Sequence, residues 1–275
     1  MVTRRDLFLR ARAAIPVENA AFEARELLYS ALRISKEDYY LSPSAPVTDA
    51  DAVRFLAMLE SRLKGEPLAY VLGEWDFYGR TFTVTPDVLI PRPETEDVVR
   101  AALSFLAGGE TVLDLCSGSG AIGITMALEK PGLSVTLGEL SDAAIAVSEE
   151  NIRKLGAEHV TVRKEDALLP PSDPNERFDM IVSNPPYIAP NEPLEDEVRD
   201  FEPAMALFGG EDGLEFYRAF AAHRLASLCA GGHIVMECGE KQAHAVEAIF
   251  LSAGARETHI LRDLSGKARV VIAGI

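Results

Sequence analysis

The sequence of 275 residues predicts an α/β protein whose main sheet has seven strands and is mostly parallel. After residue 110, short apolar segments that fit strands alternate with longer segments of helical periodicity, which is typical of a sheet covered by helices on both faces. Before residue 74 only helical patterns occur. We therefore expect a helical domain at 1–73, a β-hairpin connection at 74–90 and an α/β domain at 91–275.

Amphipathic segments predict the helices of the first domain. An apolar pattern begins at Leu7, and AAFEARELLYSAL (20–32) repeats apolar residues at i, i+3 and i+4. Thr48 and Asp49 can cap a third helix at 52–63. These helices should pack together through their apolar faces and leave their charged faces in solvent.

A hairpin and a stiff link should join this domain to the next. EWDFYGRTFTV (74–84) alternates around a glycine, which indicates a β-hairpin. IPRPETE (90–96) contains two prolines and then enters a helix whose first turn holds Glu94 and Glu96, where the helix dipole favours negative charge. The second domain should therefore begin with a helix and not with a strand.

The α/β domain is predicted from a series of apolar runs that fit strands. They cover residues 111–115, 134–140, 159–163, 178–183, 231–238, 255–261 and 268–273. The last two runs are separated by RDLSGK, which is too short for a parallel crossover, so these strands should pair antiparallel.

Charge is distributed unevenly along the chain. Residues 1–85 carry 11 Lys or Arg and 12 Asp or Glu, so residues 86–275 hold −15 of the formal net charge of −16. A domain that binds phosphate backbones usually presents a basic face. We therefore expect no direct nucleic-acid partner, because most of the α/β domain would repel one.

Composition also bounds the location and the chemistry. No apolar stretch approaches the roughly 18 residues of a membrane span, so no membrane association is expected. The chain has three cysteines, an odd number without zinc-like spacing, which suits the reducing cytoplasm. The histidines are scattered, and we expect no metal site.

A glycine-rich loop marks a ligand site. VLDLCSGSGAIG (112–123) follows a predicted strand and opens a helix, and Gly118, Gly120 and Gly123 spell G-x-G-x-x-G. Glu139 ends the next strand. In an open, Rossmann-like sheet this is where a nucleotide-like ligand binds. A turn without a ligand would not require a glycine on each side of Ser119.

The acids around this loop favour a cationic ligand. Asp114 would repel the pyrophosphate of a dinucleotide, whereas the sulfonium and ammonium groups of S-adenosylmethionine gain from a carboxylate. Glu139 can hold ribose hydroxyls. Asp166 can accept a hydrogen bond from the adenine amino group, and the adjacent Ala167 N–H can donate to a ring nitrogen. A role as a helix N-cap would explain Asp166 as well. A dinucleotide-binding protein stays as an alternative. The candidate cofactor-binding residues are Asp114, Cys116, Ser117, Gly118, Ser119, Gly120, Glu139, Asp166, Ala167 and Asn184.

The stretch IVSNPPYIAP (181–190) ends a buried strand in an amide, two prolines and an aromatic ring. The side-chain carbonyl of Asn184 and the backbone carbonyl of Pro185 are two acceptors that the prolines hold rigidly. Tyr187 offers a flat face for stacking, and Pro186 completes the expected substrate-binding residues. Asn184, Pro185 and Tyr187 are therefore candidate catalytic residues for methylating a planar amine, which can be adenine N6, cytosine N4, guanine N2 or a glutamine amide.

Most of residues 65–217 resembles one family, the HemK/PrmC-type release-factor glutamine methyltransferases. The matching stretches are GEPLAYVLGEWDFYG, LIPRPETE, LDLCSGSGAIG, VSNPPYI and FEPAMALFGGEDGLEFY. The resemblance implies a class I methyltransferase fold that uses S-adenosyl-L-methionine and yields S-adenosyl-L-homocysteine. It implies N5-methylation of the glutamine in the Gly-Gly-Gln motif of class-1 peptide chain release factors, with the helical domain gripping the factor.

The sequence departs from the family pattern at a few positions. Cys116 and Ser117 stand where many members have Gly and Thr, Glu139 replaces a commoner Asp, and Ala167 occupies a position that is aromatic in some relatives. None of these changes removes a candidate catalytic group. An amino-methyltransferase acting on a nucleic-acid base remains the alternative enzyme. EPLEDEVRD (192–200) is expected to be a solvated, mobile flap.

Overall fold

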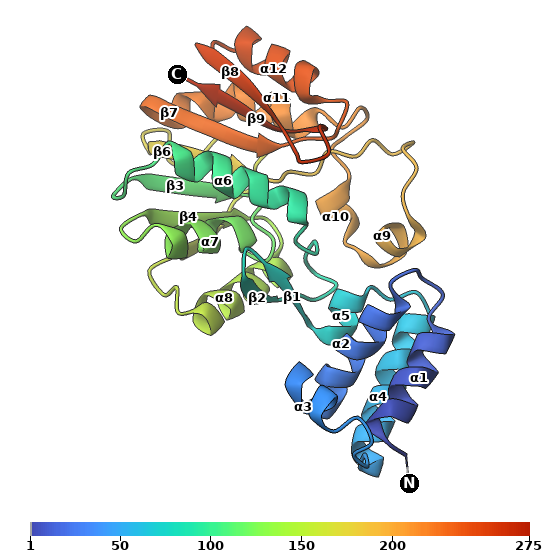
Figure 1. Ribbon diagram of the computed structural model, residues 1–275. Helices are drawn as coiled ribbons and strands as arrows, with labels where there is room; N and C mark the ends of the chain where they lie inside the picture. The colour runs from blue at the N-terminus through green and yellow to red at the C-terminus, as the bar shows by residue number, and fades with distance from the viewer. Residues whose placement is uncertain (1) are drawn as a thin grey trace. The chain divides into compact units, whose positions relative to one another are not determined.

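The computed structural model describes residues 2–275 of the chain (Figure 1). Contacts divide the chain into two compact units. The helical unit comprises the chain up to Glu74 together with Leu194–Phe201, and the sheet unit comprises Trp75–Pro193 and Glu202–Ile275. The chain therefore leaves the sheet unit after Pro193 and returns to it at Glu202.

Helices that pack against one another form the helical unit. Its helices are α1 (Arg4–Ala14), α2 (Ala20–Leu32), α3 (Lys36–Leu41), α4 (Asp49–Leu63), α5 (Leu68–Leu72) and α9 (Asp196–Phe201). Thr48 caps α4 as predicted, because its side chain accepts a hydrogen bond from the backbone N–H of Asp51, and Asp49 is the first helical residue. The sequence does not predict α3 and α5, since helices of six and five residues are too short to show a period.

The acidic segment at 192–200 differs from the flap that the sequence predicts. Its residues are mostly exposed, as expected, but its second half forms α9. Arg62 forms an ion pair with Glu197 at 3.2 Å, and it also holds the buried Glu23 at 2.7 Å. A Cβ on Gly65 would lie 3.5 Å from the ring of Phe201. The segment is thus anchored within the helical unit.

The sheet unit begins with the predicted hairpin, formed by β1 (Glu74–Phe77) and β2 (Arg80–Thr83). Phe77 and Phe82 are buried, and their rings meet edge to face at 6.1 Å between centroids. Full burial of a large apolar side chain contributes about 1.5–3 kcal/mol, so these rings fix the hairpin to the core behind it.

The seven strands of the main sheet are β3 (Thr111–Leu115), β4 (Ser134–Glu139), β5 (Thr161–Lys164), β6 (Phe178–Ser183), β7 (Leu228–Glu237), β8 (Glu257–Arg262) and β9 (Ala268–Gly274). Their order is β5-β4-β3-β6-β7-β9-β8. β3 to β7 run parallel, and β9 is antiparallel to both β7 and β8. The predicted fold class is confirmed, including the antiparallel pairing of the last two strands.

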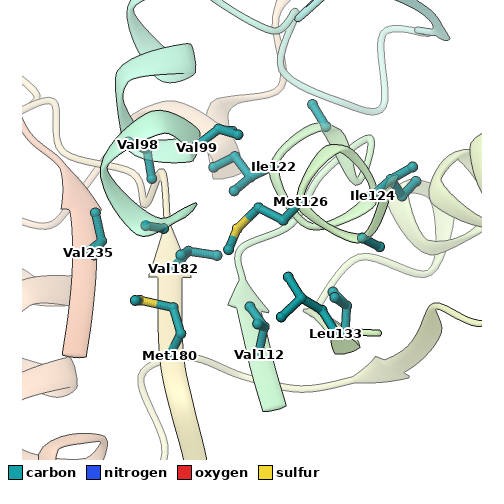
Figure 2. Packing of buried hydrophobic residues seen from close by; sticks show 14 of the residues in the cluster. Val98, Val99, Val112, Ile122, Ile124, Met126, Leu133, Met180, Val182 and Val235 are labelled. Atoms are coloured by element: carbon teal, nitrogen blue, oxygen red, sulfur yellow. The ribbon is translucent and has the colours of Figure 1, made fainter. Parts of the chain in front are cut away.

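Two apolar cores lie on opposite faces of this sheet. The α-helices of the sheet unit are α6 (Glu96–Ser104), α7 (Ala121–Glu129), α8 (Asp142–Leu155), α10 (Ala204–Leu207), α11 (Glu215–His223) and α12 (Ala243–Ser252). Side chains alternate along a strand, so Val182 of β6 joins the core of α6 and α7, whereas Ile181 joins that of α11 and α12. Figure 2 shows the first core, where Val98, Ile122 and Met126 pack over the strands.

The strand order determines where a ligand can bind. From β3 the chain continues to β4 and β5 on one side and then returns to β6 on the other. Loops at the carboxyl ends of β3 and β6 consequently lead away in opposite directions and leave a crevice, which is the usual ligand site of an open α/β sheet.

Candidate active site

A cavity of about 430 Å³ lies at this edge of the sheet unit. The loops after four neighbouring parallel strands line it, together with residues 86–91 and parts of the segment 203–216. The predicted residues that line it are Cys116, Ser117, Gly118, Ser119, Glu139, Asp166, Ala167, Asn184 and Pro186. The strand topology thus brings side chains from distant parts of the sequence to one cavity.

The other predicted residues do not line the cavity: Asp114, Gly120, Pro185 and Tyr187. Asp114 is fully buried on β3, where its Oδ2 accepts the backbone N–H of Gly123 at 2.8 Å and its Oδ1 has no partner among the described residues. Burial is the main cause that raises the pKa of Asp114 to about 8; the hydrogen bond from Gly123 lowers it, and the nearby charge of Glu139 raises it. Asp114 therefore anchors α7 behind the loop without lining the cavity, and its raised pKa works against the negative charge that the sequence predicts there.

Glu139 joins the glycine loop to the end of β4. Its Oε2 accepts the N–H of Gly118 at 2.9 Å, and its Oε1 accepts those of Leu140 at 2.8 Å and Ser141 at 2.9 Å. A carboxylate has about four lone-pair sites, so Oε2 keeps one for a ligand hydroxyl. The carboxylate that we expect to hold ribose hydroxyls thus already ties the two loops together, and only its Oε2 has a lone pair left for a ligand.

The loop residues after β3 offer polar atoms and no nucleophile. Ser117 is buried, and its Oγ has no hydrogen-bond partner among residues 2–275. Cys116 has a φ of 57°, a left-handed conformation that favours glycine. Burial raises the pKa of the Cys116 thiol, which disfavours the thiolate form that a nucleophilic cysteine requires.

The loop after β5 is braced from behind. The Oδ1 of Asp166 accepts the N–H of Leu168 at 2.9 Å, so the side chain caps a turn rather than a helix. Arg224 is fully buried, pairs with Glu165 at 2.6 Å, and donates to the carbonyl oxygens of Asp166 at 3.3 Å and Leu169 at 3.1 Å. This guanidinium holds the loop that carries Asp166 to the cavity.

The NPPY turn after β6 is tied to a buried hydrogen-bond network. The Nδ2 of Asn184 donates to Thr95 at 3.1 Å, whereas the Asn184 Oδ1 is buried without a partner in the described part of the chain. The Tyr187 hydroxyl donates to Glu237 at 3.1 Å, and Thr95 donates to the same carboxylate at 2.5 Å. An unsatisfied buried acceptor costs free energy unless a ligand supplies a donor, so the Asn184 oxygen is the atom best suited to bind a substrate N–H.

The segment FEPAMALFGGEDGL supports this turn. The Gly209 N–H donates to the carbonyl oxygen of Ile188 at 3.0 Å. A Cβ on Gly209 would lie 2.4 Å from the carbonyl oxygen of Pro186, and one on Gly213 would lie 2.3 Å from that of Tyr187. Gly209 and Gly213 are therefore required because the two backbones touch at these positions.

IPRPETE and FEP meet through an ion pair between Arg92 and Glu202, and Glu202 also accepts the N–H of Ile90 at 3.4 Å. Thr95, from the same IPRPETE segment, lines the cavity beside Asn184. Sequence reasoning misses Thr95 and Glu237 as site residues. The available signals were the position of Glu237 at the carboxyl end of a parallel strand and the place of Thr95 within a distinctive motif.

Within 2–275, no group of three or more His, Cys, Asp or Glu side chains could hold a metal ion. No helix in this range is both long enough and apolar enough to span a bilayer.

The comparisons with known proteins agree with this geometry. Residues 100–201 match the Methyltransferase small domain family, and residues 7–73 match the PrmC N-terminal domain family. The release factor glutamine methyltransferase of Cereibacter sphaeroides is 41% identical over 95% of this chain and 96% of its own length. That of Bordetella pertussis is 42% identical over 90% of this chain and 92% of its own.

Among solved structures, a 16S rRNA N2 methyltransferase of T. thermophilus in complex with AdoMet and guanosine superposes with a TM-score of 0.53. It is 20% identical, and the match covers 73% of this chain and 49% of the other, so this likeness shows the fold alone. Fold and cavity together define a class I methyltransferase. Within that class, the chain belongs to the release factor glutamine methyltransferase family.

Proposed function

We propose that this enzyme transfers a methyl group from S-adenosyl-L-methionine to the side-chain amide nitrogen of the glutamine in the Gly-Gly-Gln motif of class-1 peptide chain release factors. Membership of the family supports the substrate class. The observation that carries the chemistry is the buried Asn184 oxygen, which has no partner among the described residues although Asn184 lines the cavity.

The residues present fit S-adenosylmethionine. A cavity of about 430 Å³ is within the usual range for small-molecule sites. Glu139 keeps a lone pair for a ribose hydroxyl, and the buried Ser117 hydroxyl is unpartnered in the described chain. When bound, this cofactor supplies an electrophilic methyl group on a sulfonium.

Asn184 orients the nucleophile. The nitrogen of a glutamine amide is a poor nucleophile because its lone pair is delocalised into the carbonyl. An acceptor that holds one N–H fixes the direction of that nitrogen and stabilises the positive charge that develops on it, which is a contribution of orientation and electrostatics. The Pro185 carbonyl, as a second acceptor, and the Tyr187 ring, as a stacking face, stay predictions for the same amide.

We further propose that the helical unit grips the release factor and that the enzyme works in the cytoplasm. The match of residues 7–73 to the PrmC N-terminal domain family supports a role specific to this family. The sheet unit carries most of the net negative charge, so a protein partner with basic surfaces suits it better than a nucleic acid.

Transfer of labelled methyl from S-adenosylmethionine tests the proposal. The wild-type enzyme should label an intact class-1 release factor and should fail to label the same factor with its Gly-Gly-Gln glutamine replaced by asparagine. RNA and DNA serve as parallel acceptors. Labelling of nucleic acid with none on the factor would refute the proposal in favour of a nucleic-acid amino-methyltransferase.

A further inference from the structure

Glu237 is a buried acid that the chemistry above leaves without a role. It is 2% exposed and stands at the end of β7. In the parallel pairing of β6 with β7, Ser183 lies opposite Met236. The residues that follow, Asn184 and Glu237, therefore emerge at the same edge of the sheet, next to the cavity.

One carboxylate connects both functional side chains of the NPPY turn. Thr95 Oγ1 donates to Glu237 Oε2 at 2.5 Å, and the Tyr187 hydroxyl donates to Oε1 at 3.1 Å. Asn184 Nδ2 donates in turn to Thr95 Oγ1 at 3.1 Å. The Tyr217 hydroxyl donates to the backbone oxygen of Glu237 at 2.9 Å, which fixes the strand end.

The direction of these hydrogen bonds follows from the number of hydrogens available. An ionised carboxylate can only accept, and a threonine hydroxyl has a single hydrogen. With that hydrogen given to Glu237, Thr95 can only accept from Asn184, so the Asn184 NH₂ group must face Thr95. A reversed amide would place its NH₂ group against the N–H of the substrate, donor against donor.

We infer that Thr95 and Glu237 are positioning residues: they keep the Asn184 amide turned so that its oxygen is the atom left free for the substrate N–H. The inference rests on the proposed function, because it concerns the orientation of the same planar amine. It assigns to these two buried groups a task that they perform through Asn184.

Protonation of Glu237 would reverse this relay. A protonated Glu237 can donate to Thr95, and the Thr95 hydrogen then becomes available to the Asn184 oxygen. The pKa of Glu237 is raised above its ordinary value because burial outweighs the hydrogen bonds from Thr95 and Tyr187, which lower it, while the charges of Arg269 and Glu94 act in opposite directions. Turnover should accordingly be lost as pH falls through the pKa of Glu237.

Substitutions at Thr95 separate this relay from simple packing. Thr95→Val keeps the shape and removes the hydroxyl, whereas Thr95→Ser keeps the hydroxyl. Thr125→Val is the matched control, because Thr125 is fully buried in α7 and its hydroxyl has no partner among the described residues. The readouts are the single-turnover rate on an intact release factor at saturating S-adenosylmethionine, the donor affinity, and the pH dependence of the rate.

We expect Thr95→Val to slow the single-turnover step by about tenfold or more, the scale of one lost polar contact, while donor affinity changes by less than about twofold. Thr95→Ser should recover most of the rate, Thr125→Val should match wild type, and Glu237→Gln should lose the acidic limb of the pH profile. Equal rates for Thr95→Val and wild type would overturn the inference alone, as would a Ser variant as slow as Val. A wild-type enzyme that methylates no release factor would instead overturn the proposed function, and the inference with it.

Discussion

Glu139 gives the sharpest test of how the cavity holds its cofactor. Glu139→Ala removes the acceptor of three backbone N–H groups, those of Gly118, Leu140 and Ser141. It also removes the remaining lone pair expected to hold a ribose hydroxyl. A hydrogen bond to a charged group contributes about 1.5–3 kcal/mol, so S-adenosylmethionine should bind about 10- to 150-fold more weakly.

Glu139→Ala should also lower the stability of the protein in the absence of cofactor. Because water entering the cavity can satisfy part of the three freed N–H groups, we expect the free energy of unfolding to fall by about 2–3 kcal/mol and not by the full sum. Isothermal calorimetry measures the affinity, and denaturant unfolding measures the stability. Glu139→Asp is the matched control, since it keeps the charge and shortens the reach by one methylene, and it should lose less on both counts. Unchanged affinity and stability in Glu139→Ala would refute this description of the site.

Three further substitutions test other parts of the account. The pKa of Asp114 is about 8 in the folded protein and 3.8 as its ordinary value in the unfolded chain. The contribution of Asp114 to the free energy of unfolding should therefore fall as pH rises between these values. Asp114→Asn should flatten this dependence when unfolding is measured as a function of pH. Asn184→Ala should lower the single-turnover rate by about 10²-fold with little change in S-adenosylmethionine affinity, and the reverse pattern would contradict its role. Gly213→Ala should lower the unfolding midpoint and the turnover, because its φ is +72° and the added Cβ meets the Tyr187 carbonyl at 2.3 Å. Gly266→Ala is its control, with a φ of +80° and nothing within 4 Å, and an equal loss in both would show that backbone strain alone is responsible.

Much of the fold could be predicted because its signals are local. β3 and β6 have the bounds that their apolar runs predict, and the short RDLSGK link correctly requires antiparallel pairing. The insertion of β9 between β7 and β8 could not be predicted, because the order of strands in a sheet depends on contacts between distant residues. The docking of α9 within the helical unit was hidden for the same reason, since Arg62 and Glu197 are far apart in sequence.

The candidate site also contains features that could be predicted from local sequence and features that could not. The loop after β3, Glu139 and Asn184 could be placed at one cavity from their positions at strand ends, and their individual roles stay predictions. The burial of Asp114 behind the loop could not be predicted. The sequence near the end of this strand does not reveal which face of the sheet a given side chain points to. Thr95 and Glu237 form a hydrogen bond with each other across 142 residues of sequence, and no local pattern reports such a contact.

The central claim is that this enzyme methylates a glutamine amide, and a tandem mass spectrum of a class-1 release factor after incubation with enzyme and S-adenosylmethionine tests it most directly. We predict a single added methyl group on the side-chain nitrogen of the Gly-Gly-Gln glutamine, and none in the same time with Asn184→Ala. A methyl group on any other residue of the factor, or an unmodified factor beside a methylated nucleic-acid base, would contradict the account.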